Sequence, residues 1–214
     1  PDALVNDYGC DSLRMYELFV GPPELDAEWD DRGIDGVNRF LKRLWNLLMD
    51  SKEADVQPTK EMIKLRHKMV YDITNRLESF SLNTVISGFM EYNNKFIEMA
   101  KKEGGIDKET LETIAVLLSP FAPHFAEEMW EQLGHGETIF KAGWPSYDES
   151  AMKDDEIEVP VQINGKTRAV ISISADASKD EAIAAGKEAV ADKLTGTIVK
   201  EIYVPKKIIN IVQK

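Results

Sequence analysis

Hydrophobic residues recur every three or four positions through the first two thirds of the sequence, which is the spacing of amphipathic α-helices. Asp11 is able to cap the second of two short helices that are broken near Gly9, and Asp107 is able to cap the last long helix of the series. Several long helices with short connections predict a helical bundle. The predicted helices cover residues 1–20 in two parts, about 36–50, 59–78 and 81–102, and a stretch that begins after Asp107.

A proline corner follows that last helix. Pro120 and Pro123 lack a backbone N–H and push the preceding residue out of the helical region, so one apolar helix must end here and another must begin. Pro123 suits the first position of the new helix, and Gly134 is placed to end it. The apolar stripe of this second helix consists of Ala126, Met129, Trp130 and Leu133.

Beyond about residue 156 the hydrophobic pattern changes to strict alternation, which is typical of β-strands. Asn164-Gly165 is a strong signal for a two-residue hairpin turn. Ser178 and Glu181 have the spacing of a capping box, which predicts a helix from there to about Leu194. This region is therefore predicted to be a small α+β domain in the order β-β-α-β-β, with its last two strands over about 197–204 and 207–213.

The predicted fold class is a mainly α helical bundle followed by this α+β domain, and four regions follow from the patterns. Residues 1–33 form a helical segment that precedes the bundle, and residues 34–134 form the bundle itself. Residues 135–155 are glycine-rich and polar and are predicted to be a linker with room to drape over the bundle. Residues 156–214 form the α+β domain.

The composition is that of a globular protein. Of 214 residues, 43% are hydrophobic and 30% are charged, no apolar run reaches the length of a membrane span, and no signal peptide opens the sequence. We therefore expect a cytoplasmic protein with no membrane partner. Cys10 is the only cysteine, which excludes an internal disulfide and a multi-cysteine zinc site, and we expect it to pack as a small apolar group. Because the sequence begins at Pro1 inside a helical pattern, we interpret it as a piece of a longer protein.

The net charge of −12 argues against a general affinity for nucleic acid, because phosphate binding depends on lysine and arginine. The whole excess lies in residues 1–154, so any RNA contact must come from local basic faces. Arg39, Lys42 and Arg43 form one such face at helical spacing, opposite the apolar side of their helix. They either contact an RNA backbone or form an ordinary solvated face. The cations of the next helix are spread around it and form no compact patch: Lys60, Lys64, Arg66, Lys68 and Arg76.

The sequence offers no catalytic constellation. Gly165-Lys166-Thr167 resembles the end of a phosphate-binding loop, but position 160 is proline instead of the required glycine, and a strand follows instead of a helix. His124 with Glu127 and Glu128 provides too few ligands for a zinc site. We therefore predict neither a catalytic site nor a metal site in this chain.

Several stretches resemble a known family. The run Ser-Pro-Phe-Ala-Pro-His-Phe-Ala-Glu-Glu-Met-Trp over 119–130 is similar to the last helices of the anticodon-binding bundle in class I aminoacyl-tRNA synthetases of the leucyl, isoleucyl, valyl and methionyl group. The run over 8–22 resembles the segment that follows the Lys-Met-Ser-Lys-Ser loop of these enzymes, and its Phe-Val-Gly-Pro ending, with Trp29 shortly after, looks most like the leucyl enzymes. The runs over 161–168 and 202–212 resemble the C-terminal domain of bacterial leucyl-tRNA synthetases.

This resemblance implies the tRNA-docking portion of a monomeric enzyme that attaches leucine to tRNA(Leu), with ATP and Mg²⁺ used by the catalytic domain and no cofactor in this portion. It implies that the bundle supports the tRNA from the inside of its L shape and that the last domain reaches the outer corner. A valyl, isoleucyl or methionyl enzyme is the alternative within the class, and the small terminal domain would be discordant there. A helical adaptor that binds protein is an alternative of another kind, which an exposed apolar groove would favour. Phosphate contacts are expected from Arg39, Lys42 and Arg43, and corner contacts from Lys166, Arg168, Lys206 and Lys207.

Overall fold

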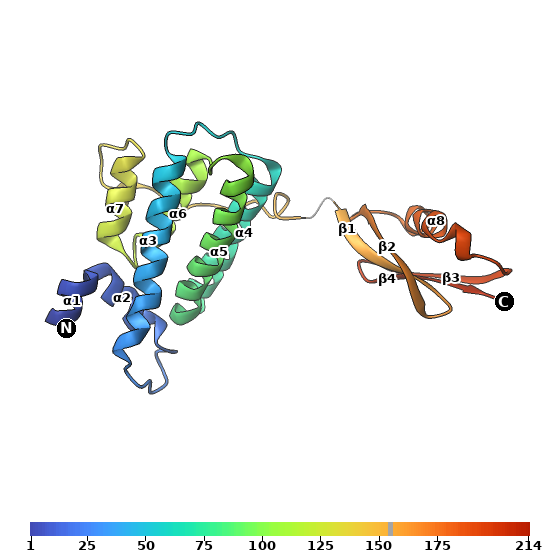
Figure 1. Cartoon of the computed structure of the whole chain (residues 1–214), viewed down its shortest axis with the longest axis horizontal. Coiled ribbons are helices and arrows are strands. Elements are labelled where there is room, and N and C mark those ends of the chain that lie inside the picture. The colour runs from blue at the N-terminus through green and yellow to red at the C-terminus, as the bar shows by residue number, and fades with distance from the viewer. Residues whose placement is uncertain (154–155) are drawn as a thin grey trace. The chain divides into compact units, whose positions relative to one another are not determined.

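A computed structural model of the chain describes residues 1–153 and 156–214 and divides into two compact units. The bundle unit, residues 1–152, is helical, and the sheet unit, residues 153–214, combines a helix with a small β-sheet (Figure 1). Each unit buries its own hydrophobic cluster. The predicted fold class is confirmed. The last two positions of the predicted linker, 154 and 155, lie outside the described residues.

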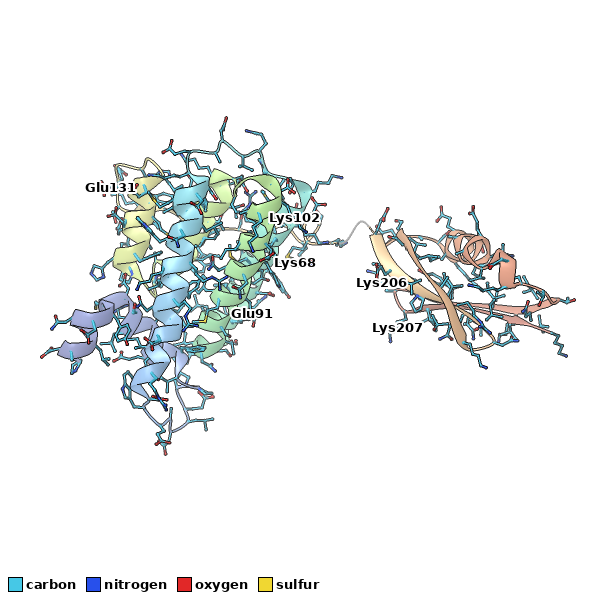
Figure 2. The ribbon with its side chains drawn as sticks, viewed as in Figure 1. Lys68, Glu91, Lys102, Glu131, Lys206 and Lys207 are labelled. Atoms are coloured by element: carbon cyan, nitrogen blue, oxygen red, sulfur yellow. The ribbon has the colours of Figure 1, made fainter. Side chains whose placement is uncertain are left out.

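The helices of the bundle unit begin and end close to the predicted positions. The three longest, α3 to α5, run alongside one another, and charged side chains such as Glu91, Lys102 and Glu131 point outward from the bundle (Figures 1 and 2). Short 3₁₀ turns lie at Asp31–Gly33 and Ile139–Lys141. The α-helices are α1 (Asp2–Tyr8), α2 (Cys10–Phe19), α3 (Ile34–Ser51), α4 (Lys60–Glu78), α5 (Leu82–Glu103), α6 (Lys108–Leu118) and α7 (Pro123–Gln132).

The helix ends are fixed by the residues that cap them. Asp107 caps α6 as predicted, because its carboxylate accepts a hydrogen bond from the Thr110 amide at 3.1 Å. Asp11 does not cap its own helix, so that prediction is wrong. Its carboxylate instead accepts the Phe125 amide at 2.6 Å and contacts His124 Nδ1 at 2.8 Å. Since Pro123 opens α7 and no side chain of α7 caps that end, Asp11 supplies the missing acceptor from α2.

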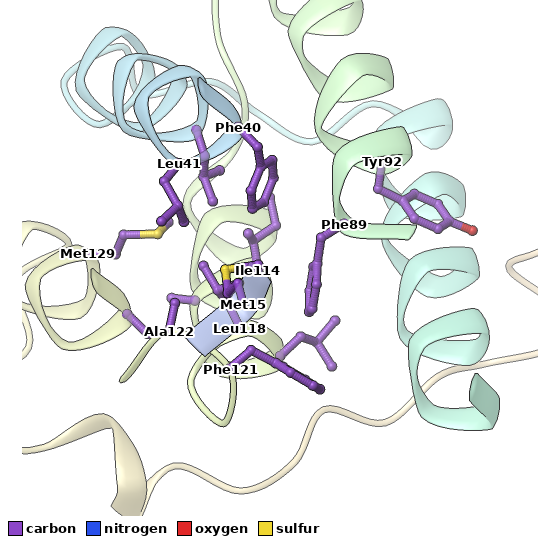
Figure 3. Packing of buried hydrophobic residues seen from close by; sticks show 14 of the residues in the cluster. Met15, Phe40, Leu41, Phe89, Tyr92, Ile114, Leu118, Phe121, Ala122 and Met129 are labelled. Carbon is purple, nitrogen blue, oxygen red and sulfur yellow. The ribbon is translucent and has the colours of Figure 1, made fainter. Parts of the chain in front are cut away.

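The proline corner packs into the core of the bundle. Phe121, which lies between the two prolines, is 3% exposed, and its ring packs edge-on against Phe89 of α5 with centroids 5.7 Å apart. Ala122, Met129 and Met15 are fully buried around it (Figure 3). Because each fully buried large apolar side chain contributes about 1.5–3 kcal/mol, this cluster holds α2 and α5 against the corner between α6 and α7.

A buried ion pair joins α4 to the start of α6. Arg66 Nη1 lies 3.2 Å from Asp107 Oδ1 and 3.0 Å from Glu109 Oε2. The side chains of Arg66 and Asp107 are 8% and 3% exposed, whereas that of Glu109 is 70% exposed. Arg66 is therefore part of the bundle's interior and not one of the solvent-facing cations of α4.

The segment after α7 lies over α4. Trp144 Nε1 donates to Thr74 Oγ1 at 3.0 Å, and the Asp148 amide donates to His67 Nδ1 at 3.1 Å. The ring of Tyr147 packs edge-on against Tyr71 of α4, with centroids 5.1 Å apart. These contacts place the described residues of the predicted linker up to 152 in the bundle unit.

The sheet unit contains strands β1 (Glu156–Ile163), β2 (Lys166–Ser174), β3 (Ile198–Val204) and β4 (Ile208–Gln213), and helix α8 (Lys179–Ala189) between the second and third. The strand order is β2-β1-β4-β3, in which β1 and β4 are parallel and both outer pairs are antiparallel. Helix α8 packs on one face of the sheet (Figure 1). The predicted order β-β-α-β-β is confirmed.

Local signals determine most of this unit. Asn164 and Gly165 have φ of 50° and 80°, which is the two-residue hairpin turn that the sequence predicts. The capping box of Ser178 and Glu181 is present. Helix α8 ends at Ala189, however, before the predicted end near Leu194, because the fully buried Val190 leaves the helical region and a 3₁₀ turn follows.

Two further properties concern the whole chain. None of the helices within residues 1–153 and 156–214 is long and apolar enough to cross a membrane. Cys10 is exposed, so the prediction that it packs as a buried apolar group is wrong. The helix α2 begins at Cys10 directly after Gly9, whose φ of 85° turns the chain, and Cys10 is exposed although the next residues, Asp11 and Ser12, are buried.

Candidate nucleic-acid interface

The basic face of α3 is accessible. Arg39, Lys42 and Arg43 are all exposed, because the opposite side of α3 carries the buried core residues Phe40 and Leu44. Within the described residues none of the three cations forms an ion pair, so their charges are available to a ligand. Acidic groups also lie near this face, among them Asp35, one turn before Arg39 on α3.

One such acid is Glu98 on α5. The pKa of Glu98 is lowered chiefly by the hydrogen bond from Lys101, at 2.7 Å, and to a smaller extent by the charges of Lys102 and Arg43. Glu98 is therefore engaged mainly with the lysine one turn further along α5. This leaves Arg43 largely uncompensated.

The three cations of α3 do not share one surface. Arg39 and Arg43 line a cavity of about 180 Å³ between α3 and α5. Lys42 instead lines a larger cavity of about 710 Å³ between α2, α3 and α7, whose wall also includes the apolar side chains of Trp45 and Phe125. The structure thus brings Arg39 and Arg43 together and places Lys42 on the other flank of the helix.

The cavity between α3 and α5 contains a residue that the basic pattern does not reveal. Asn93 of α5 is 5% exposed and lines this cavity with the neighbouring, exposed Asn94. Within the described residues its Oδ1 atom is buried and has no hydrogen-bond partner. A sequence signal was available, since two adjacent asparagines in the middle of a long helix are unfavourable there without another purpose.

A second cationic area lies where α4 meets α5. Burial lowers the pKa of Lys68, and the charges of Lys64 and Lys95 lower it further. Lys95 Nζ lies 4.9 Å from the centre of the Tyr92 ring, and the Tyr92 hydroxyl donates to Asp72. The cations of α4 are thus joined by a lysine from the next helix, which helical spacing within α4 alone does not predict.

The four cations predicted to contact RNA from the sheet unit form two separate pairs. Lys166 and Arg168 follow the β1–β2 turn and are exposed. Lys206 and Lys207 are exposed at the β3–β4 turn, where Figure 2 labels them. The first turn lies beside the end of β4, because the Gln213 amide donates to Asn164 Oδ1 at 2.9 Å.

Lys207 immediately precedes β4, and the first turn lies beside the opposite end of that strand. Lys166 pairs with Ile163 of β1, which in turn pairs with Ile211 of β4. Lys166 therefore lies about 13 Å from Lys207 along the strand direction, at about 3.3 Å per residue, and two strands away across the sheet. A single phosphate cannot span them, so any contacts that they make are to different parts of a ligand.

The remaining candidates form other contacts. His124 contacts Asp11 and not the two glutamates that follow it on α7. Glu127 accepts hydrogen bonds from the Thr138 hydroxyl and the Ile139 amide. No group of three or more metal-ligating side chains gathers within the described ranges. Lys166 opens a strand, so the Gly165-Lys166-Thr167 run does not precede a helix.

Comparison with known proteins supports one family. Residues 59–183 match the family model described as the anticodon-binding domain of tRNA ligase. The chain is 45% identical over 231 residues to a leucine–tRNA ligase of Fervidobacterium nodosum, a match that covers 100% of the chain and 28% of that protein. It is 42% identical to a leucine–tRNA ligase of Phocaeicola vulgatus, with 99% and 23% covered. The chain thus spans about a quarter of the length of these curated relatives.

A solved structure shares the fold. It is a LeuRS of Agrobacterium radiobacter K84 in a ternary complex with tRNA and LeuAMS, and it superposes with a TM-score of 0.78 at 24% identity over 100% of this chain and 29% of that one. The resemblance inferred from the proline corner and the terminal strands is confirmed. The chain belongs to the family of anticodon-binding domains of tRNA ligases, and along its whole length it is similar to leucine–tRNA ligases.

Proposed function

We propose that residues 1–214 are the tRNA-docking part of a cytoplasmic, monomeric leucine–tRNA ligase, which attaches leucine to tRNA(Leu) with ATP and Mg²⁺. The observation that carries the proposal is the identity to leucine–tRNA ligases across the entire chain, including the sheet unit. A valyl, isoleucyl or methionyl enzyme would share the bundle, but the agreement over 100% of the chain favours the leucyl one. The part studied contributes binding and not bond-making groups.

Its role is to position the RNA. Binding energy from contacts remote from the reacting atoms orients a substrate and so sustains the rate of a distant chemical step. The exposed cations of α3 and of the two sheet-unit turns supply phosphate contacts. Because the chain as a whole has a charge of −12, these local sites must bind the RNA against a generally repulsive field.

Salt dependence tests this proposal. The full chain is titrated against a tRNA(Leu) transcript at a series of salt concentrations, and the slope of log affinity against log salt is compared between wild type and Arg39→Ala/Arg43→Ala. Each lost phosphate contact should reduce the slope by about 0.7–0.9, so the double variant should lose about 1.5. Lys102→Ala/Lys108→Ala removes the same charge at exposed positions of α5 and α6 and serves as the matched control. Equal salt slopes in the two variants would show that Arg39 and Arg43 of α3 do not contact the tRNA.

The sheet unit is tested in the same way with two further variants. Lys166→Ala/Arg168→Ala and Lys206→Ala/Lys207→Ala should each weaken binding, and their effects should add because the two pairs are separated by two strand spacings, about 10 Å or more. Unchanged affinity of the first variant at moderate salt would reject the placement of a tRNA contact at the β1–β2 turn.

One observation favours a different candidate, an adaptor that binds protein. The cavity of about 710 Å³ beside Trp45 and Phe125 is largely apolar and open to a partner helix. The titration above separates the two functions, since an adaptor would show no salt-dependent affinity for tRNA.

A further inference from the structure

The cavity of about 180 Å³ between α3 and α5 combines two kinds of chemistry. Arg39 and Arg43, one helical turn apart on α3, line one wall and supply its guanidinium-bearing side chains. Asn93 brings a nearly buried amide to the other wall, from α5. Guanidinium groups suit phosphate oxygens, whereas an amide oxygen needs a neutral N–H or O–H donor. The cavity therefore fits a ligand that carries an anion beside a hydroxyl group.

The unpaired Asn93 oxygen is the feature that calls for a ligand. A buried acceptor without a partner is destabilising, and native proteins retain few of them. The asparagine amide rotates about a broad, roughly two-fold torsion, and a turn that exchanges its oxygen and nitrogen brings the oxygen toward the cavity that the side chain already lines. A donor that enters between the helices would satisfy it.

The size of the cavity limits which ligands can fit. Since a water molecule occupies about 30 Å³ of liquid, 180 Å³ holds the equivalent of about six waters, which suits a sugar ring better than a whole nucleotide. RNA supplies the required pair of groups at each residue, a phosphodiester anion and a ribose 2′-hydroxyl donor. The 2′-hydroxyl is also the group by which proteins distinguish RNA from DNA.

We propose that Asn93, together with Arg39 and Arg43, forms a ribose–phosphate site in which the Asn93 amide oxygen accepts a hydrogen bond from a 2′-hydroxyl. The site rests on the proposed tRNA-docking function and adds to it a residue that selects RNA by its sugar. Arg39 and Arg43 fix the phosphate and bring the adjacent ribose against α5. Asn93 then acts as a specificity residue that carries no charge.

The test compares natural tRNA(Leu) with transcripts that carry 2′-fluoro groups at either all pyrimidines or all purines. A 2′-fluoro group keeps the sugar pucker of RNA and removes the donor. The full chain and its Asn93→Leu variant are titrated against all three transcripts. Leucine has the branched shape of asparagine and cannot accept a hydrogen bond. Asn75→Leu, at an exposed position of α4, is the matched control.

Wild type and Asn75→Leu should bind the natural transcript about fivefold more tightly than one of the fluorinated transcripts, in line with the loss of one hydrogen bond. Asn93→Leu should lose that preference and keep the salt slope of wild type. Because the variant removes an unpaired buried atom, its urea midpoint by tryptophan fluorescence should equal or exceed that of wild type, which establishes that it is folded.

Gly36→Leu offers a second route to the same site. Gly36 lines the cavity, and a Cβ atom added there meets no atom within 4 Å, so the new side chain can occupy the cavity. This variant should also lose the preference for the 2′-hydroxyl, together with part of its overall affinity.

The outcomes separate the two proposals. Tight, salt-dependent binding with the same preference in wild type and Asn93→Leu overturns the ribose site and leaves the docking function standing. A lack of salt-dependent binding to any transcript overturns the docking function itself. In a further experiment, inorganic phosphate is added at constant ionic strength to compete with tRNA(Leu) for binding. If phosphate competes with wild type but not with Asn93→Leu, free phosphate and not ribose occupies the cavity.

Discussion

Replacing Asp107 with alanine should destabilise the bundle unit by about 3 kcal/mol. The Asp107 side chain is 3% exposed and accepts three hydrogen bonds, from Arg66, from the Thr110 amide and from the Thr110 hydroxyl. Loss of the helix cap alone costs about 1 kcal/mol. The remainder arises because the Arg66 guanidinium, 8% exposed, loses its buried counter-ion, and removal of one partner of a buried pair typically costs about 3–5 kcal/mol.

Glu109 places the expected value at the lower end of that range. Its carboxylate stays 3.0 Å from Arg66 and is 70% exposed, so it offsets part of the charge that Asp107 leaves unpaired. The double variant Arg66→Met/Asp107→Ala removes both buried charges and should cost only about 1 kcal/mol, the value of the cap. The double variant is thus expected to be more stable than Asp107→Ala alone.

Urea unfolding followed by tryptophan fluorescence measures this difference in the intact chain. All four tryptophans lie at or before position 144, so their emission reports the bundle unit and not the sheet unit. A loss of only about 1 kcal/mol for Asp107→Ala would mean that the cap alone matters. A double variant less stable than Asp107→Ala would refute the reasoning that an unpaired buried charge dominates.

Three further predictions concern the helix ends and a tight packing contact. Asp11→Ala should lower the stability of the bundle unit by about 1–2 kcal/mol in the same assay, since the first turn of α7 loses its acceptor, and an unchanged midpoint would contradict this role. Gly33→Ala should cost about 1–3 kcal/mol, because the added Cβ atom would lie 2.3 Å from the hydroxyl of the buried Tyr16, and wild-type stability would show that the ring can move. Hydrogen bonds from Ser178 lower the pKa of Glu181, so this part of the α8 cap is fully present above the ordinary glutamate value of 4.5 and is lost as the pH falls through the lowered folded pKa. The loss of hydrogen-exchange protection in α8 on Glu181→Ala should therefore be larger at pH 7 than well below that folded pKa, and an equal loss at both pH values would exclude a contribution from the Glu181 carboxylate.

Local patterns in the amino-acid sequence were enough to predict the helices and strands of this chain. The regular geometry of helices and strands fixes the spacing of side chains on one face, so the hydrophobic periodicity predicts these elements. The proline corner, the Asn164-Gly165 turn and the capping box of α8 depend on residues only a few positions apart, so their signals are also local. The helix end that differs most from the prediction is that of α8, where Val190 is buried against the sheet, which is a tertiary effect.

The partners of individual side chains, by contrast, depend on how distant segments of the chain pack together. Asp11 caps α7 by accepting a hydrogen bond from the amide of Phe125, which is 114 positions further along the chain. The charge of Arg66 on α4 is paired with that of Asp107 at the start of α6. Arg39 and Arg43 share a cavity with Asn93, and Lys42 does not, although all three cations have the same helical spacing. Helical periodicity gives the direction of a side chain on its own helix, but burial and partners depend on which other helix covers that direction, and that is set by the packing of segments far apart in the chain.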